Sequence, residues 1–263
     1  MGPDQHARFV ESALLGETSL GVKTEYSNLL LCALPKSASL YTTQFLAHCF
    51  GLKNHQIGFD RSGGRIYYPR LLGAKFRGAG TISHCHAAPD RATLRMIEVL
   101  DLQPLVLTRD LRDALVSRRT MLTRDGYTGG MLSRQAMQRY QAADDVDKLH
   151  TVISLYGPEY LNFLAGWEDR RGQGERPPVF LTYEDVTADD VNTVRRIGRE
   201  LGLEATEDRI REVRETIQRL GGINLTRGGP GRGAEAFLPE HEERLRDLAE
   251  RLGCEAALGL QTT

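Results

Sequence analysis

Near its start, this chain of 263 residues carries a continuous apolar run, a short polar loop and a helical pattern in direct succession. The apolar run at 29–34 predicts a strand that is buried on both faces of a parallel sheet. Pro35 ends the strand because proline has no N–H to donate. The pattern from Leu40 to Phe50 predicts a helix that Gly51 can close. A loop between a strand and a helix N-terminus suits a phosphate or sulfate, because free backbone N–H groups and a positive dipole end converge there.

The side chains of this loop add to the same prediction. Lys36 supplies a mobile cation, and Ser37 and Ser39 supply hydroxyl donors. Only five lysines occur in the chain, so a lysine in this loop is less readily explained by chance. The loop lacks the glycines of a Walker A motif. An ordinary turn with Ser37 or Ser39 as helix N-cap is the alternative interpretation.

Composition limits the classes of partner and compartment. The net charge of −1 gives no bulk attraction to nucleic acid or to an anionic membrane, so any anion site must be local. The four cysteines form no C-x-x-C pair, which favours buried free thiols in a reducing compartment. No apolar run approaches a membrane span, and the N-terminus lacks a signal-peptide pattern. We therefore expect a cytoplasmic protein without stable membrane insertion.

The order of predicted elements indicates the fold class. Strand patterns alternate with helical patterns, which favours an α/β protein with three αβα layers around a central, mainly parallel sheet. We expect a single domain over 1–263, with a lead-in at 1–27 and a helical region at 120–176. The further predicted strands are 81–86, 103–109 and 178–183, and the predicted helices include 92–100, 113–119, 188–201, 207–220 and 239–252.

A second polar motif follows the predicted strand at 103–109. Arg109 stands at the strand's carboxyl edge, and Ser117 follows eight residues later, early in the next predicted helix. A guanidinium fork and a hydroxyl so placed can close on one phosphate. In open α/β sheets, ligands bind outside the carboxyl ends of the strands, where Arg109 would lie beside the first loop. The alternative to a phosphate site is a surface network of arginine and aspartate side chains that caps the helix.

Two further groups of residues are candidates for a site. The loop 224–233 combines four glycines with Arg227 and Arg232, so it can bring backbone amides and charge to an anion; a flexible basic loop is the alternative. His84 and His86 are two residues apart on a predicted strand, so their side chains point to the same face. Such a pair is usually structural, or a weak indication of a metal site that needs further ligands.

The motifs, taken together, resemble those of sulfotransferases that use 3′-phosphoadenosine 5′-phosphosulfate (PAPS). The first loop is similar to their 5′-phosphosulfate loop, although the family usually has Gly and Thr where this chain has Ala38 and Leu40. The segment R-D-x-R-D-x-x-x-S at 109–117 resembles their 3′-phosphate motif. The loop at 227–228 resembles the start of their C-terminal R-G-x-x-G segment. The resemblance covers about 28–233 and implies a P-loop NTPase-like sulfotransferase fold.

The resemblance also implies how each motif meets the cofactor. The first loop would hold the 5′-phosphosulfate, and the 109–117 motif with the C-terminal segment would hold the 3′-phosphate. Two tyrosines would lie near the adenine. The cofactor residues so implied are Lys36, Ser37, Ala38, Ser39, Leu40, Tyr41, Arg109, Ser117, Tyr183, Arg227 and Gly228, with Arg232 a weaker candidate.

Sulfotransferases often deprotonate the acceptor with a histidine on the strand before the 3′-phosphate strand. The resemblance favours His84 as this base, with His86 as the alternative, and histidine suits the task because its pKa is about 6.5. Ile82 stands where cytosolic members often have a lysine two residues before the histidine. Lys36 and Ser39 would stabilise charge on the bridging oxygen as 3′-phosphoadenosine 5′-phosphate (PAP) leaves. The resemblance implies no metal.

The sequence thus predicts an enzyme that transfers a sulfonate group from PAPS to an acceptor hydroxyl by in-line displacement, with an amine as the less favoured acceptor. The class of acceptor and the oligomeric state are not predicted. A kinase or NTPase would use the same strand, loop and helix but would need magnesium and ATP. A non-catalytic nucleotide-binding module would keep the loops without needing the histidine.

Overall fold

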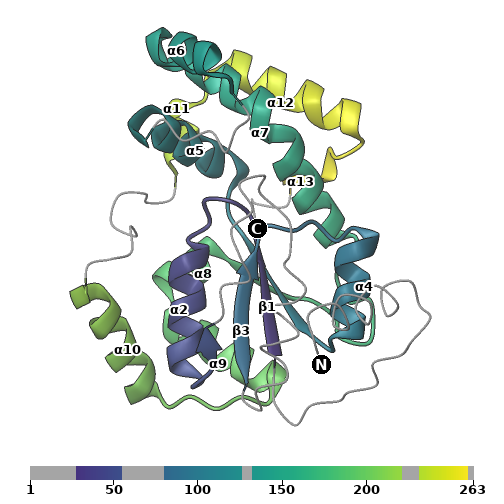
Figure 1. The fold of residues 1–263 in the computed structure, drawn as a ribbon, viewed down its shortest axis with the longest axis vertical. Helices are drawn as coiled ribbons and strands as arrows, with labels where there is room; N and C mark the ends of the chain where they lie inside the picture. The colour runs from purple at the N-terminus through teal and green to yellow at the C-terminus, as the bar shows by residue number, and fades with distance from the viewer. Residues whose placement is uncertain (1–27, 55–79, 126–131, 221–230, 260–263) are drawn as a thin grey trace, which may run out of the picture.

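A five-stranded parallel sheet forms the centre of the molecule, in the computed structural model that describes residues 28–54, 80–125, 132–220 and 231–259. The strand order is β2-β3-β1-β4-β5, and every neighbouring pair is parallel. β1 lies in the middle and is buried along its whole length, as its apolar run predicts (Figure 1). The strands are β1 (Asn28–Ala33), β2 (Lys53–Asn54), β3 (Thr81–Cys85), β4 (Gln103–Thr108) and β5 (Val179–Thr182).

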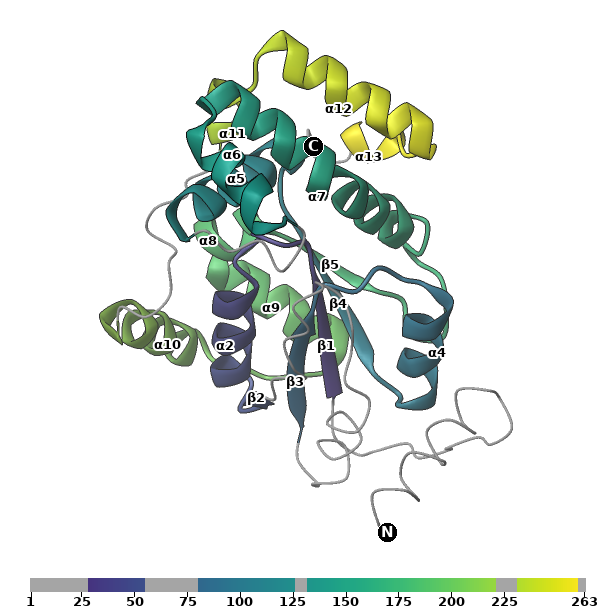
Figure 2. The ribbon, with the colours of Figure 1, turned by 45° about the horizontal axis from the view of Figure 1, so that its top comes forward.

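Helices cover both faces of the sheet, so the predicted three-layer αβα architecture is confirmed (Figure 2). Alternate side chains of β1 enter two separate cores, as strand geometry requires. Leu29 and Leu31 pack with α2 (Ser39–Cys49), α8 (Tyr183–Ala188), α9 (Asp190–Leu201) and α10 (Glu207–Leu220). Leu30 and Cys32 pack on the other face with α4 (Arg91–Val99), α5 (Leu111–Asp125), α7 (Asp145–Glu168), α12 (Pro239–Leu252) and α13 (Ala256–Gly259).

The predicted strands and helices are confirmed, with one clear difference at the end of β5. The strand predicted over 178–183 stops at Thr182, and Tyr183 begins α8 instead. A capping box causes this change: the Thr182 hydroxyl accepts from the Asp185 N–H, and the Asp185 carboxylate accepts from the Thr182 N–H. Because the chain turns here, Tyr183 lies at the carboxyl edge of the sheet.

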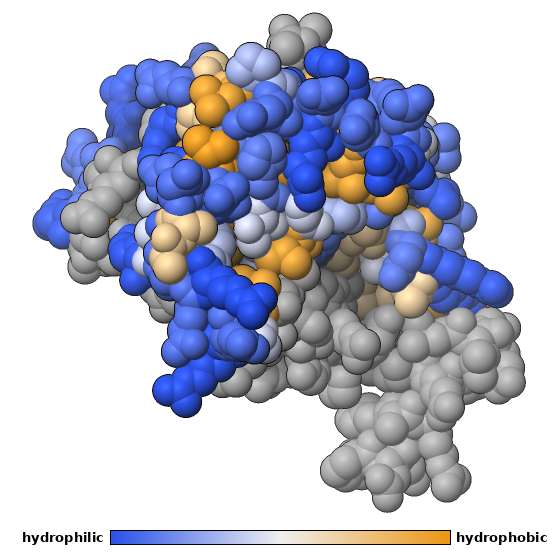
Figure 3. Space-filling model, turned by 90° about the horizontal axis from the view of Figure 1, so that it is seen from above, coloured by the Kyte–Doolittle hydropathy of each residue, from blue (hydrophilic) through white to orange (hydrophobic). Residues whose placement is uncertain are grey.

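A group of helices stands over this carboxyl edge. Figure 1 shows α5, α7 and α12 at one end of the molecule, together with α6 (Arg134–Ala142) and α11 (Arg232–Ala236). From this end the surface is largely hydrophilic, with apolar residues gathered between the charged ones (Figure 3). No helix among the described residues has the length and apolar composition needed to cross a bilayer.

Candidate functional site

The loop between β1 and α2 has an unusual backbone. Lys36 and Ala38 have φ values of 74° and 65°, in the left-handed region that non-glycine residues enter at a cost of about 1–2 kcal/mol each. The Ser37 hydroxyl is buried and donates to the Leu34 carbonyl at 2.6 Å, which holds the loop closed from inside. Such strain is typical of loops that turn backbone N–H groups toward an anion.

The first turn of α2 keeps its amides available. The N-cap residue is Ala38, and no side chain caps the helix, so the alternative with Ser37 or Ser39 as N-cap is wrong. The N–H groups of the first turn have no partner within the helix. Ser39 is buried at this turn and Leu40 is exposed. The uncapped first turn of α2 directly follows the strained loop, so its backbone N–H groups are candidates for anion binding.

Arg109 connects this loop to the neighbouring strand. Its Nη1 donates to the Lys36 carbonyl at 2.9 Å, and its Nη2 lies 3.6 Å from the Asp113 carboxylate. The guanidinium stacks on the Tyr183 ring, with Cζ 4.1 Å from the ring centroid. The structure thus brings together three residues that the sequence predicted for one site, Lys36, Arg109 and Tyr183. Ser117 lies half-buried on α5, eight residues beyond Arg109.

Asp113 was not predicted as a site residue, although it is part of the quoted R-D-x-R-D motif. Its buried carboxylate accepts from the N–H groups of Gly231 at 2.9 Å and Gly233 at 2.5 Å. These bonds hold the start of α11 against α5, beside Arg109. The predicted residues Arg227 and Gly228 lie outside the described residues, and Arg232 is half-buried at the start of α11.

Replacing Gly233 by alanine is expected to destabilise the fold. The added Cβ would meet the backbone of α5, at 2.8 Å from both the Arg112 carbonyl carbon and the Asp113 nitrogen. Because backbone cannot yield cheaply, the free energy of unfolding should fall by about 1–3 kcal/mol. Denaturant unfolding monitored by circular dichroism measures the change. Gly259→Ala is the matched control, since its Cβ would meet nothing within 4 Å; equal stability of both variants would contradict this packing.

The two candidate histidines have different environments. His84 lies within β3, beside Leu31 in the register, and burial lowers its pKa. His86 follows the end of β3, and its Nδ1 lies 2.7 Å from the Ala33 carbonyl at the end of β1. Burial is the main cause that lowers the pKa of His86, to about 4. Because a carbonyl only accepts, Nδ1 carries the hydrogen and Nε2 keeps a lone pair in the neutral ring.

Tyr41 lies apart from these residues. Its ring stacks on Phe45 at a centroid distance of 5.4 Å and is buried in the core beneath α2. Burial raises the pKa of its hydroxyl to about 12. To stack on an adenine, the ring would have to leave this core. The geometry therefore argues against the role in base binding that the sequence suggested for Tyr41.

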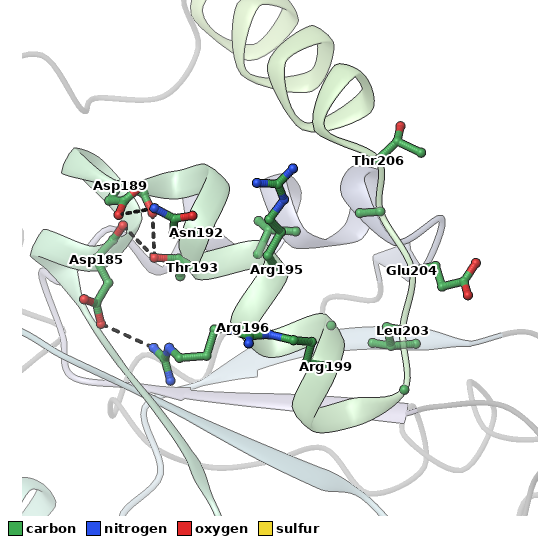
Figure 4. A pocket seen from close by; sticks show the side chains of 14 residues that line it. Asp185, Asp189, Asn192, Thr193, Arg195, Arg196, Arg199, Leu203, Glu204 and Thr206 are labelled. Atoms are coloured by element: carbon green, nitrogen blue, oxygen red, sulfur yellow. Dashed lines mark hydrogen bonds and ion pairs between the residues drawn. The ribbon is translucent and has the colours of Figure 1, made fainter.

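A surface pocket of about 1240 Å³ lies elsewhere, along α8, α9 and the segment before α10 (Figure 4). None of the predicted site residues lines it. Its charges largely compensate one another: Arg195 pairs with Glu207 at 2.6 Å, and Arg196 lies 3.5 Å from Asp185. Lys36, Arg109 and Tyr183 lie together at the carboxyl edge of the sheet and not in this pocket.

Between α7 and α12, one group of described side chains could hold a metal ion, formed by His150, Glu240 and His241. Both ring nitrogens of His241 already meet the backbone: Nδ1 accepts from the Leu238 N–H at 3.0 Å, and Nε2 lies 3.1 Å from the Val146 carbonyl. A metal could bind His241 only by breaking one of these contacts. The arrangement is explained as a cap of α12.

Comparison with known proteins links this geometry to one family. The family model for the sulfotransferase domain matches residues 27–219. The structure of mouse sulfotransferase SULT7A1 complexed with PAP is similar, with a TM-score of 0.63 at 11% identity, over 94% of this chain and 92% of the other. A retinol dehydratase in complex with retinol and PAP has a TM-score of 0.57 at 13% identity, over 97% and 87%. No curated protein sequence matches significantly.

Proposed function

Because this chain belongs to the sulfotransferase domain family, we propose that it transfers a sulfonate group from PAPS to an acceptor hydroxyl. In this reaction the acceptor oxygen attacks sulfur, the bond from sulfur to the bridging phosphate oxygen breaks, and PAP leaves. The observation that carries the proposal is the contact of Arg109 with the Lys36 carbonyl. This contact joins the strained loop before α2 to the strand that bears the R-D-x-R-D motif.

Donor binding would divide between the two joined elements. The loop amides, Lys36 and Ser39 would hold the 5′-phosphosulfate, and Lys36 would stabilise the charge that develops on the bridging oxygen. Arg109 and Ser117, with Arg227 and Gly228, would hold the 3′-phosphate. Tyr183, already stacked on Arg109, would lie near the adenine.

The acceptor proton would pass to a histidine at the carboxyl edge. The sequence favoured His84, but the contact of His86 with Ala33 supports His86. This contact holds the Nε2 lone pair in one orientation next to the end of β1, and a general base needs such positioning. His84 would then stand two residues before the base, at the place of the family's lysine. We propose His86 as the base and His84 as its neighbour in the site.

Calorimetric titration with PAP, ADP and ATP, without added metal, tests the cofactor. We expect PAP to bind at least about tenfold more tightly than ADP, since charge-assisted bonds to the 3′-phosphate contribute about 1.5–3 kcal/mol. In Arg109→Lys the preference for PAP over ADP should shrink, because a lysine ammonium cannot form the paired hydrogen bonds that an arginine guanidinium makes with a phosphate. Equal or tighter binding of ATP, strengthened by magnesium, would instead indicate a kinase. PAP binding without turnover of any acceptor would indicate a binding module.

We further propose a reducing, cytoplasmic compartment and an acceptor that bears a hydroxyl group. All four cysteines are free and buried, which supports a reducing environment. Retinol, the molecule named in the complex of the retinol dehydratase, bears a hydroxyl group and is consistent with that acceptor chemistry. Absence of the protein from a cytosolic fraction of its host cell would contradict the compartment.

A further inference from the structure

We propose that Arg118 binds an anionic group of the acceptor, so that the preferred acceptor carries a carboxylate, phosphate or sulfate in addition to its hydroxyl. This inference rests on the proposed function and specifies the class of acceptor. Arg118 follows Ser117 directly on α5, and its side chain contacts Tyr160 of α7.

The guanidinium of Arg118 is held in one orientation by two tyrosines of α7. Its Nε donates to the Tyr160 hydroxyl at 2.9 Å, and its Cζ lies 4.6 Å from the centroid of the Tyr156 ring. One hydrogen bond and one stacking contact fix the plane of the fork. These contacts use Nε and the face of the group, so neither of them engages the two terminal amino groups.

The charge of Arg118 has no close counter-ion in the described part of the chain. None of the ion pairs among the described residues, defined by a separation of 4.0 Å or less, includes Arg118. The carboxylate that acts on it is Glu159, which forms no ion pair with it; burial raises the pKa of Glu159 and the charge of Arg118 lowers it. Burial lowers the pKa of Arg118, but Tyr160, Tyr156 and Glu159 together raise it, so the guanidinium keeps its charge at this partly buried position and can meet an anionic ligand.

Arg118 faces the region in which transfer would occur. The Nζ of Lys36 lies 3.7 Å from the Sδ of Met121, which places Lys36 against one side of α5. Arg118 precedes Met121 by three residues and therefore shares that side of the helix. The positive charges of Lys36 and Arg118 both act on the imidazole of His86. An acceptor that approaches His86 would thus come within reach of the Arg118 fork.

Binding of matched ligand pairs to the PAP-loaded protein tests the inference. Calorimetry would compare 4-hydroxybenzoate with 4-hydroxybenzamide, glucuronate with glucose, and a sugar phosphate with its parent sugar. We expect the anionic member of at least one pair to bind about tenfold more tightly, and this preference to vanish in Arg118→Met. Arg119→Met is the matched control, since Arg119 contacts the Asp145 carbonyl at the helix surface and should leave the preference unchanged.

Each result decides the inference separately from the proposed function, because that function is tested by PAP binding and by turnover and not by the preference between the two members of a ligand pair. The inference would be overturned if both members of every pair bound equally well. It would also be overturned if Arg118→Met still bound the anionic member more tightly than the neutral one. If Arg118→Met does not fold, Tyr160→Phe keeps the cation and removes only its Nε partner. We expect the anionic preference to weaken in that variant, and an unchanged preference would again overturn the inference.

Discussion

Replacing Lys36 by methionine is expected to lower kcat for sulfonate transfer by about 10²–10³-fold, the usual effect of removing one donor that stabilises transition-state charge. Methionine keeps the length and apolar stem of the side chain but has no ammonium group. Arg109 donates to the Lys36 carbonyl and not to its side chain, so this bond and the shape of the loop should persist in the variant. Initial rates with saturating PAPS and acceptor measure the effect.

Lys53→Met is the matched control for this variant, because Lys53 is exposed on β2 and remote from the loop. We expect its kcat to equal that of the unmodified protein. PAP binding by Lys36→Met should weaken far less than kcat, since the loop amides and the 3′-phosphate contacts remain. A kcat close to that of the unmodified protein would remove Lys36 from the proposed mechanism.

Replacing His86 by glutamine is expected to lower kcat by about 10²–10⁴-fold, the range that general base catalysis contributes. The glutamine amide can still donate to the Ala33 carbonyl, which keeps the structural contact while removing the basic nitrogen. PAP affinity should therefore stay near its original value. Single-turnover kinetics with bound PAPS separates the chemical step from product release.

The variant His84→Gln distinguishes the two histidines. If His86 is the base, His84→Gln should retain a much larger share of kcat than His86→Gln. A larger loss in His84→Gln would return the base to the residue that the sequence favoured. Full activity in both variants would mean that the acceptor loses its proton to another group.

The pH dependence of kcat/KM provides a second test of His86. The neutral ring is the active form, and burial lowers the pKa of this ring to about 4. Activity should therefore persist as the pH falls through 6 and 5 and decline only toward 4, where the ring gains a proton. An acidic limb near the ordinary histidine pKa of about 6.5 would contradict the burial and the contact that hold this ring neutral.

Local patterns in the sequence sufficed for the architecture. The apolar run of β1 and the alternation of strands and helices predicted the parallel sheet, and the polar loop at Lys36 marked a candidate anion site at its carboxyl edge. These features depend on near neighbours: burial of successive side chains sets the strand, and periodicity sets the helices. The motif at Arg109 indicated a second part of this candidate site for the same reason, since it follows its strand directly.

Contacts between distant residues required the tertiary structure. Asp113 meets Gly231 and Gly233 across 118 and 120 positions of the chain, and no local pattern predicts that pairing. The contact of His86 with Ala33 likewise exists because β3 and β1 are neighbours in the sheet. The sequence restricts which residue types reach the carboxyl edge. Which side chains meet there depends on strand order and helix packing, because a hydrogen bond needs partners within about 3 Å in space, whatever their separation along the chain.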